Sequence, residues 1–207
     1  MDLYYTIEST PCRAVIMAAK TIGVELNRRK LHLRQGEHLT PEYLKINPQH
    51  KVPTLVDDGF PIWESRAILI YLVEKYGKDD SLYPKCPKKR ALVNQRLYFE
   101  MNLYAQFRDY FYPQFALKLP ANPDLKQKAD VQLGYLNTFL DGETYVAGEH
   151  LTIADISLLS SITTMDVAGM DLDRHPNVIR WYEHCKKIVP GYDENLEGAL
   201  AYMKFYN

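Results

Sequence analysis

The stretch that decides the fold is Met1-Asp2-Leu3-Tyr4-Tyr5, followed shortly by Ser9-Thr10-Pro11-Cys12-Arg13. The first run predicts a short strand, and the second predicts the start of a helix that continues through Ala19. Pro11 fits the first turn of a helix, where its missing N–H group costs nothing. That turn also offers unpaired N–H groups and about half a positive charge. An anion beside Ser9 would therefore be stabilised, whether it is a phosphate, a carboxylate or a thiolate.

The residues after this helix predict three more strands. Apolar and polar residues alternate over 24–33, as in a strand, and the order strand, helix, strand implies parallel pairing. A single helical turn at most is expected around Thr40-Pro41. Residues 52–56 and 60–63 predict a hairpin around Asp57-Asp58-Gly59, and a proline in its second strand predicts a sheet edge.

The first unit is expected to end with a helix and a linker. Ser65 is a good N-cap for a helix that ends before Gly77. Turn residues then predict a linker at 78–87. Beyond it the apolar spacing is helical only, with helices expected at 88–119 (kinked at Pro113), 126–140, 152–167, 177–189 and 195–206. The sequence thus predicts an α/β domain over 1–77 and an all-helical domain over 88–207.

Composition narrows the class of protein. The 207 residues carry 25 basic and 26 acidic side chains, a net charge of −1, so neither nucleic acid nor an acidic membrane surface is an expected partner. No run approaches the roughly 20 apolar residues of a membrane span, and the N-terminus does not resemble a signal peptide. Three cysteines predict no disulfide framework, which favours a cytoplasmic location.

Ser9-Thr10-Pro11-Cys12 has the spacing of the C-x-x-C redox motif with serine in place of the first cysteine. Next to a βαβ unit that motif is typical of the thioredoxin-like fold, a mixed four-stranded sheet with helices. The serine removes the nucleophile for disulfide exchange, but its hydroxyl can donate a hydrogen bond to the thiolate of another molecule. Two simpler interpretations stay open: Ser9 only caps the helix, and Cys12 is only a small buried residue.

Two further motifs combine groups that bind charged ligands. Pro53 lies directly before a strand, where a cis peptide bond after Val52 would free backbone groups for an incoming chain. Glu64-Ser65-Arg66 opens a helix and can hold an ammonium and a carboxylate on the same carbon. The alternatives are an ordinary proline at a strand entry, and a helix cap with a surface charge pair.

Loop histidines and a helix start complete the candidates. His50 and Lys51 could meet a second carboxylate, with His38 in the same irregular segment, although each histidine alone also suits a solvated loop. Thr152 and Asp155 form a capping box, so Asp155 is expected to be structural and not catalytic.

Four stretches together resemble cytosolic glutathione transferases, most closely the insect delta class. They are Asn47-Pro48-Gln49-His50-Lys51-Val52-Pro53-Thr54-Leu55, Trp63-Glu64-Ser65-Arg66-Ala67-Ile68, Asn94-Gln95-Arg96-Leu97-Tyr98-Phe99 and Leu151-Thr152-Ile153-Ala154-Asp155. The resemblance covers nearly the whole chain. It implies a thioredoxin-like first domain, a helical second domain and a homodimer.

The resemblance assigns roles to individual residues. It makes Ser9 the hydroxyl that stabilises the glutathione thiolate, and it gives the glycyl carboxylate to His50, helped by His38 and Lys51. It gives the cysteinyl backbone to Val52 beside Pro53, and the γ-glutamyl end to Glu64, Ser65 and Arg66. The implied electrophile site is Thr10, Pro11, Leu33, Tyr104, Phe107, Tyr112, Phe115 and Phe205. The implied dimer contacts are Tyr98 and Met101.

Some positions depart from the delta pattern. Ile7 and Glu8 stand where delta members often carry proline or glycine, and Glu100 stands where aspartate is usual. Other classes use an N-terminal tyrosine in place of the serine, so Tyr4 and Tyr5 are rivals to Ser9. Both lie inside the predicted strand, and Ser9 is preferred.

The resemblance implies an enzyme that conjugates glutathione, its co-substrate, to hydrophobic electrophiles. Detoxification is the expected role, with dehydrochlorination of organochlorine compounds as a candidate reaction. No metal and no bound redox cofactor is required. Two alternatives remain: a non-catalytic carrier of glutathione or hydrophobic ligands, and a thiol–disulfide oxidoreductase that uses Cys12.

Overall fold

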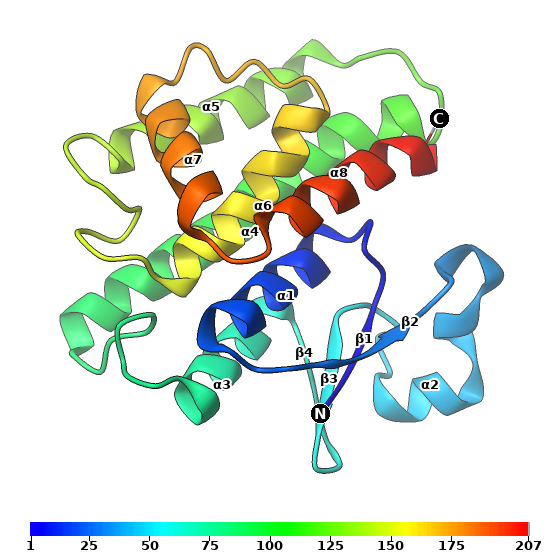
Figure 1. Cartoon of the computed structure of the whole chain (residues 1–207). Helices are drawn as coiled ribbons and strands as arrows, with labels where there is room; N and C mark the ends of the chain where they lie inside the picture. The colour runs from blue at the N-terminus through cyan, green and yellow to red at the C-terminus, as the bar shows by residue number, and fades with distance from the viewer. Residues whose placement is uncertain (207) are drawn as a thin grey trace.

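The computed structural model describes the backbone of residues 1–206 and the side chains of residues 1–204. In its first part, strands and helices alternate around one sheet (Figure 1). The elements are β1 (Asp2–Tyr5), α1 (Thr10–Ile22), β2 (Asn27–Lys30), the 3₁₀ turns η1 (Leu33–Gln35) and η2 (Glu37–Leu39), α2 (Pro41–Ile46), β3 (Thr54–Asp57), β4 (Phe60–Trp63) and α3 (Ser65–Tyr76).

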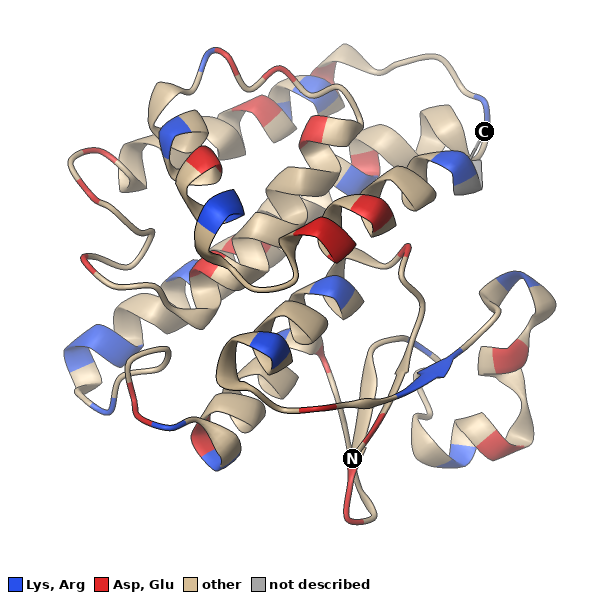
Figure 2. Cartoon of the chain, in the orientation of Figure 1, with Lys and Arg blue, Asp and Glu red and all other residues tan. Residues whose placement is uncertain are grey.

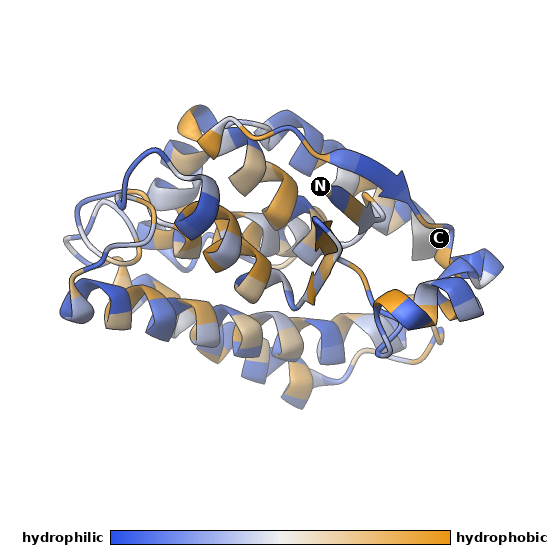
Figure 3. Cartoon of the chain, turned by 90° about the horizontal axis from the view of Figure 1, so that it is seen from below, coloured by the Kyte–Doolittle hydropathy of each residue, from blue (hydrophilic) through white to orange (hydrophobic). Residues whose placement is uncertain are grey.

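The strands form a mixed four-stranded sheet in the order β2-β1-β3-β4, which confirms the predicted fold of this half. β1 and β2 are parallel, whereas β1 with β3 and β3 with β4 are antiparallel. Helices α1 and α3 lie on one side of the sheet and α2 on the other (Figure 1). β4 is an edge strand, as its proline predicts, and β2 is a hydrophilic edge with four exposed residues (Figure 3).

The register of the antiparallel strands brings three chain segments to one end of the sheet. Tyr4 pairs with Thr54, and Thr54 pairs with Trp63. The residues just after β1, just before β3 and just after β4 are therefore neighbours in space. This end of the sheet carries the loop to Ser9, the Val52-Pro53 peptide and the start of α3 at Glu64.

Some sequence-based boundaries in the first part differ from the structure. The second strand is shorter than 24–33, because the Val24 amide still donates to the Ala19 carbonyl at the end of α1 and η1 begins at Leu33. Helix α2 has six residues, more than the expected single turn. Glu64, and not Ser65, occupies the N-cap position of α3, and Ser65 is its first residue.

A buried carboxylate ties the hairpin to α3. Asp57, at the end of β3, accepts hydrogen bonds from Lys75 (2.7 Å), Tyr71 (2.6 Å) and Tyr76 (2.5 Å). These donors, Lys75 first, hold the pKa of Asp57 well below its ordinary value. The contact fixes the turn that follows β3, at the end of the sheet opposite to Ser9.

The second part is helical, as predicted. It contains α4 (Pro87–Phe115), α5 (Pro123–Phe139), α6 (Ile153–Val167), α7 (Pro176–Ile188) and α8 (Tyr192–Tyr206). Residues 77–86 form neither helix nor strand, and Pro87, the last residue of the predicted linker 78–87, is the first residue of α4. Helix α4 contains Pro113 and ends at Phe115, four residues earlier than expected.

Helix α6 lies at the centre of this part and packs against α1 of the first (Figure 1). Its residues from Ile153 to Met165 are all buried. The predicted capping box is confirmed: the Thr152 hydroxyl accepts from the Ala154 amide, and Asp155 accepts from the Thr152 amide at 2.9 Å. None of the described helices is long and apolar enough to cross a membrane. Charges of both signs are interspersed on the chain (Figure 2).

Candidate functional site

Ser9 occupies the N-cap position of α1, but its side chain makes no capping hydrogen bond. Its backbone is fixed on both sides, because its amide donates to the Thr6 carbonyl (3.2 Å) and its carbonyl accepts from the Arg13 amide (3.1 Å). The interpretation of Ser9 as a side-chain cap is therefore not supported. The hydroxyl is left at the positive end of α1.

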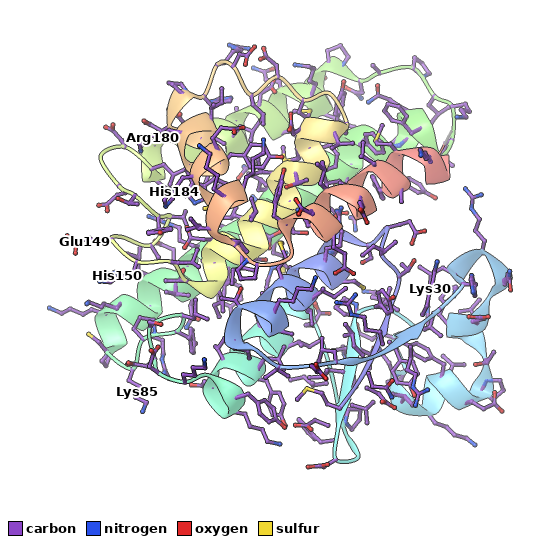
Figure 4. All side chains as sticks on the ribbon, viewed as in Figure 1. Lys30, Lys85, Glu149, His150, Arg180 and His184 are labelled. Atoms are coloured by element: carbon purple, nitrogen blue, oxygen red, sulfur yellow. The ribbon has the colours of Figure 1, made fainter. Side chains whose placement is uncertain are left out.

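A cavity of about 350 Å³ lies beside Ser9. Three segments meet there: the loop after β1, the end of β2 with η1, and α8. The lining residues are Thr6, Glu8, Ser9, Lys30, Leu31, His32, Leu33, Arg34, Gln35 and Tyr202. Leu33 is the predicted electrophile-site residue found in this lining. Lys30 stands at the C-terminal end of β2 (Figure 4).

The Val52–Pro53 peptide bond is cis, as predicted. The loop before it is held by the Lys51 carbonyl, which accepts from the Tyr43 hydroxyl (2.6 Å) and from the side-chain amide of Asn47 (3.1 Å). Asn47 is itself fully buried. The loop thus presents Val52 at a fixed place, at the same sheet end as Ser9.

His38 and His50 lie close together although eleven residues separate them in the sequence. Their ring centroids are 6.1 Å apart. His50 has a φ of 47°, which is uncommon for a residue with a side chain. His38 Nδ1 is buried and has no hydrogen-bond partner among the described residues. The two imidazoles form a pair next to the Lys51 loop.

The residues of the Glu64-Ser65-Arg66 motif lie in two environments: Glu64 and Ser65 form the start of α3, and Arg66 contacts α4. Glu64 has a φ of 66° and makes no side-chain cap, and Ser65 is buried in the first turn of α3. A strained non-glycine backbone of this kind is often found at functional sites. Arg66 instead points to the second domain, where its Nη2 lies 2.5 Å from a carboxylate oxygen of Glu100 and its Nε donates to the Leu97 carbonyl (3.2 Å).

Glu100 is the centre of a buried polar contact between the domains. Its side chain is 4% exposed, and it accepts from Ser157 (2.9 Å) and Ser161 (2.5 Å) as well as from Arg66. These contacts engage Nε and Nη2 of Arg66 and fix the first turn of α3, which carries Ser65. Direct binding of a ligand by the Arg66 guanidinium stays a prediction.

Only some of the residues predicted to line the electrophile site are exposed enough to contact a ligand. Phe107 is 0% exposed and Thr10 is 2% exposed, so these two pack inside the protein and do not face a pocket. Tyr112 is exposed, and Tyr104, Phe115 and Pro11 are half-buried. Phe115 stacks on Phe111 with centroids 4.0 Å apart. The side chain of Phe205 lies outside the described residues.

The two cysteines closest to helix starts differ in environment. Burial raises the pKa of the Cys12 thiol to about 12, although the Ser9 side chain and the Thr6 backbone act in the opposite direction. Cys12 is therefore a poor nucleophile, as expected for a small core residue. Cys86, at the start of α4, is exposed, and the backbone amides of Lys89 and Lys88 lower its pKa.

Sequence reasoning missed two residues that frame the site, Arg13 and Gly198. Arg13 is 1% exposed and donates to the side chains of Thr10 (2.9 Å) and Thr164 (2.5 Å). Tyr202 lines the cavity from α8, and Gly198 lies one turn before it. A charged residue within an apolar helix and a glycine within a helix were visible signals for these two residues.

Comparison with known proteins identifies the class. Residues 1–74 match the family model of the glutathione S-transferase N-terminal domain, and residues 101–189 match that of the C-terminal domain. A Nilaparvata lugens delta-class glutathione transferase superposes with a TM-score of 0.96 at 50% identity, covering 99% of this chain and 97% of the other. A Bombyx mori glutathione transferase gives 0.96 at 46% identity, covering 99% and 96%. An epsilon-class enzyme from Musca domestica gives 0.90 at 39% identity, covering 99% and 95%.

The chain belongs to the glutathione S-transferase family. It is a transferase with glutathione as co-substrate, as the resemblance implies. Within the family it is similar to the insect delta class, which confirms that prediction as well.

Proposed function

We propose that Ser9 activates glutathione for attack on hydrophobic electrophiles. A cysteine-type thiol has a pKa of about 8.5, so little of it is ionised at neutral pH. Lowering this pKa by about two units requires roughly 2.7 kcal/mol of preferential binding of the anion. A hydrogen bond to a charged group contributes about 1.5–3 kcal/mol, and the start of α1 adds to it. The observation that carries the proposal is that the Ser9 hydroxyl lies at that helix start and makes no capping hydrogen bond.

The reaction is a displacement. The sulfur of the bound thiolate donates an electron pair to an electrophilic carbon, a carbon–sulfur bond forms, and the leaving group departs with the electrons of its own bond. The thiol proton passes to solvent before this step. Ser9 supplies a hydrogen bond and does not change its own protonation state.

The remaining glutathione groups have partners at the same end of the sheet. His50 and His38 suit the glycyl carboxylate, with Lys51 beside them, because their rings adjoin and His38 Nδ1 is unpartnered. Val52, before the cis Pro53, suits backbone pairing with the cysteinyl unit. The γ-glutamyl end suits the Glu64 carboxylate and the helix start at Ser65. Arg66 fixes this helix start through its contact with Glu100.

The electrophile is proposed to bind in the cavity beside Ser9. Leu33 and Tyr202 are among the residues that line it, and three aromatic residues of α4, the exposed Tyr112 and the half-buried Tyr104 and Phe115, offer further apolar surface. Such a site suits xenobiotic detoxification in the cytoplasm, including dehydrochlorination of organochlorine compounds.

A homodimer is part of the proposal. Tyr98 is 69% exposed and Met101 is 48% exposed, and they lie one turn apart on α4. Large exposed apolar side chains at this spacing suit an interface with a second copy. Sedimentation analysis of wild type and Tyr98→Ala tests this part, with dissociation of the variant as the expected result.

The serine is tested with Ser9→Ala. We expect turnover of a chloronitrobenzene-type substrate at neutral pH to fall about 100-fold, which corresponds to the two pKa units above. Glutathione should still bind, because its three backbone and terminal contacts remain. Ser81→Ala, at an exposed serine of the linker, is the matched control. Full activity in Ser9→Ala would refute the role of Ser9 and direct attention to Tyr5. Retention on glutathione without turnover by the wild-type protein would favour the carrier alternative.

A further inference from the structure

Helix α8 contacts the Ser9 region along one stripe of its surface. Asn195, Gly198 and Tyr202 are spaced by three and four residues, so they lie on the same face of the helix. Asn195 is 1% exposed and Tyr202 is 8% exposed. The stripe faces α1 and the loop that precedes it.

The two ends of the stripe are fixed by different contacts. The Asn195 carbonyl accepts from Arg13 (2.9 Å), and the Asn195 side chain donates to Thr163 of α6 (3.0 Å). Tyr202 forms part of the wall of the cavity beside Ser9, and its ring stacks on Phe111 with centroids 5.5 Å apart. α8 is thus anchored in the interior on both sides of Gly198.

Gly198 permits an unusually close approach of α8 to the Ser9 loop. A Cβ atom on this residue would lie 2.5 Å from the Ile7 carbonyl oxygen, 2.5 Å from Arg13 Cδ and 2.9 Å from Ile7 Cγ1. The first of these neighbours is backbone, which cannot rotate out of the way. Glycine is a poorer helix former than alanine, so its presence in the middle of α8 requires such a packing reason.

Ile7 lies two residues before Ser9 in a short turn closed by the hydrogen bond from the Ser9 amide to the Thr6 carbonyl. A displacement of the Ile7 carbonyl therefore moves the Ser9 backbone. Ile7 and Ser9 are half-buried, whereas Asn195 of α8 and Arg13 of α1, which also adjoins Gly198, are almost fully buried. The loop is the part that has room to move.

We propose that Gly198 is a positioning residue for the catalytic serine: its missing side chain lets α8 hold the Ile7–Ser9 turn in the place where the hydroxyl meets the thiolate. This inference rests on the proposed function of Ser9. It gives the C-terminal helix a role in thiol activation in addition to its Tyr202 wall.

The test is Gly198→Ala, with Gly134→Ala as the matched control. Gly134 is also a glycine inside a helix, but nothing lies within 4 Å of an added Cβ there. The ionisation of bound glutathione is followed by difference absorption of the thiolate as a function of pH. In Gly198→Ala we expect its pKa to rise by about one unit and kcat/KM at neutral pH to fall about tenfold. The Kd for glutathione should change less than about threefold, and Gly134→Ala should match wild type.

A second variant guards against a folding defect. Ile7→Ala removes the Cγ1 that packs on Gly198, and we expect it to raise the thiolate pKa in the same direction by a smaller amount. An unchanged pKa in folded Gly198→Ala, or in Ile7→Ala if the first variant does not fold, overturns the proposal. Loss of activity in Ser9→Ala together with an unchanged Gly198→Ala refutes the role of Gly198 alone, whereas full activity in Ser9→Ala refutes both roles.

Discussion

Replacement of Asp155 by alanine is predicted to be among the most destabilising single changes in the helical domain. The carboxylate is fully buried at the start of α6. One oxygen accepts from the Val146 amide (2.8 Å) and from Trp181 Nε1 (2.9 Å). The other accepts from the amide (2.9 Å) and the hydroxyl (3.0 Å) of Thr152. The side chain therefore joins the loop before α6, the helix start and α7.

The magnitude follows from the donors that Asp155→Ala leaves behind. Three buried N–H groups lose their acceptor, and each unsatisfied donor costs about 1–3 kcal/mol. The sum is about 3–9 kcal/mol, before any relaxation of the structure around the alanine. We expect a loss of about 4 kcal/mol in the free energy of unfolding. This is a large share of the roughly 5–15 kcal/mol that stabilises an ordinary domain.

Urea denaturation followed by far-ultraviolet circular dichroism measures this loss, with Asp173→Ala, at an exposed aspartate, as the control. Trp181→Phe removes one donor, and we expect it to cost about 2 kcal/mol. The double variant should lose less than the sum by about 1–2 kcal/mol, because the Nε1 donor is then no longer left unpaired. A loss below about 1 kcal/mol for Asp155→Ala, or strict additivity with Trp181→Phe, would refute this reasoning.

Three other predictions follow from the titratable and buried groups. The pKa of Asp57 is lowered in the folded protein, so the Asp57 carboxylate stabilises the fold above about pH 4 and this contribution is lost as the pH falls further. In urea titrations, the difference in unfolding free energy between wild type and Asp57→Asn should therefore shrink from about pH 7 to about pH 3. Glu100→Gln leaves the Arg66 cation without its carboxylate, and we expect a loss of about 2 kcal/mol in the free energy of unfolding. This loss is smaller than for a fully buried pair, because the Arg66 side chain is 17% exposed and the amide oxygen of glutamine still accepts a hydrogen bond. Calorimetry should also show weaker glutathione binding in this variant. Iodoacetamide at neutral pH should modify Cys86 and spare Cys12, and a Cys12 adduct found by peptide mass spectrometry on the native protein would revive the disulfide oxidoreductase alternative.

Local chemistry made much of the fold predictable. The hairpin after β3 follows from its Asp-Asp-Gly turn, and the capping box at Thr152 follows from residues three positions apart. The boundaries that were predicted wrongly depend on residues that are distant in the sequence. The length of β2 is set by its pairing with β1, and the positive φ of Glu64 is imposed by the sheet end and α3 together. Neither is encoded in the spacing of nearby residues.

In the candidate site, too, the features set by nearby residues could be predicted from the sequence, and those set by distant partners could not. The N-cap position of Ser9 and the cis peptide bond before Pro53 could be predicted, because both lie in short segments whose residue types restrict the backbone. The direction of the Arg66 side chain could not be read from the Glu64-Ser65-Arg66 motif, because its partner Glu100 lies in the other domain. Phe107 has the helical spacing of both core and pocket residues, and only packing decides between the two.

The polar residues of α6 explain why the pocket has one defined shape. This helix is buried on every side, yet it carries five hydroxyl side chains in its second half and centre: Ser157, Ser160, Ser161, Thr163 and Thr164. Ser160 donates to the Thr10 carbonyl (2.7 Å), and Thr164 shares a hydrogen bond with the Thr10 hydroxyl (2.9 Å). A purely apolar surface would tolerate sliding of one domain on the other. A buried hydroxyl without a partner costs about 1–3 kcal/mol, so movement that breaks the Ser160–Thr10 contact carries this cost, whereas the Thr164 hydroxyl keeps its bond to the Ser160 carbonyl of its own helix (2.9 Å). The Ser160–Thr10 contact holds the start of α1 against α6, and α8 contacts both helices, which makes the serine site a product of both domains.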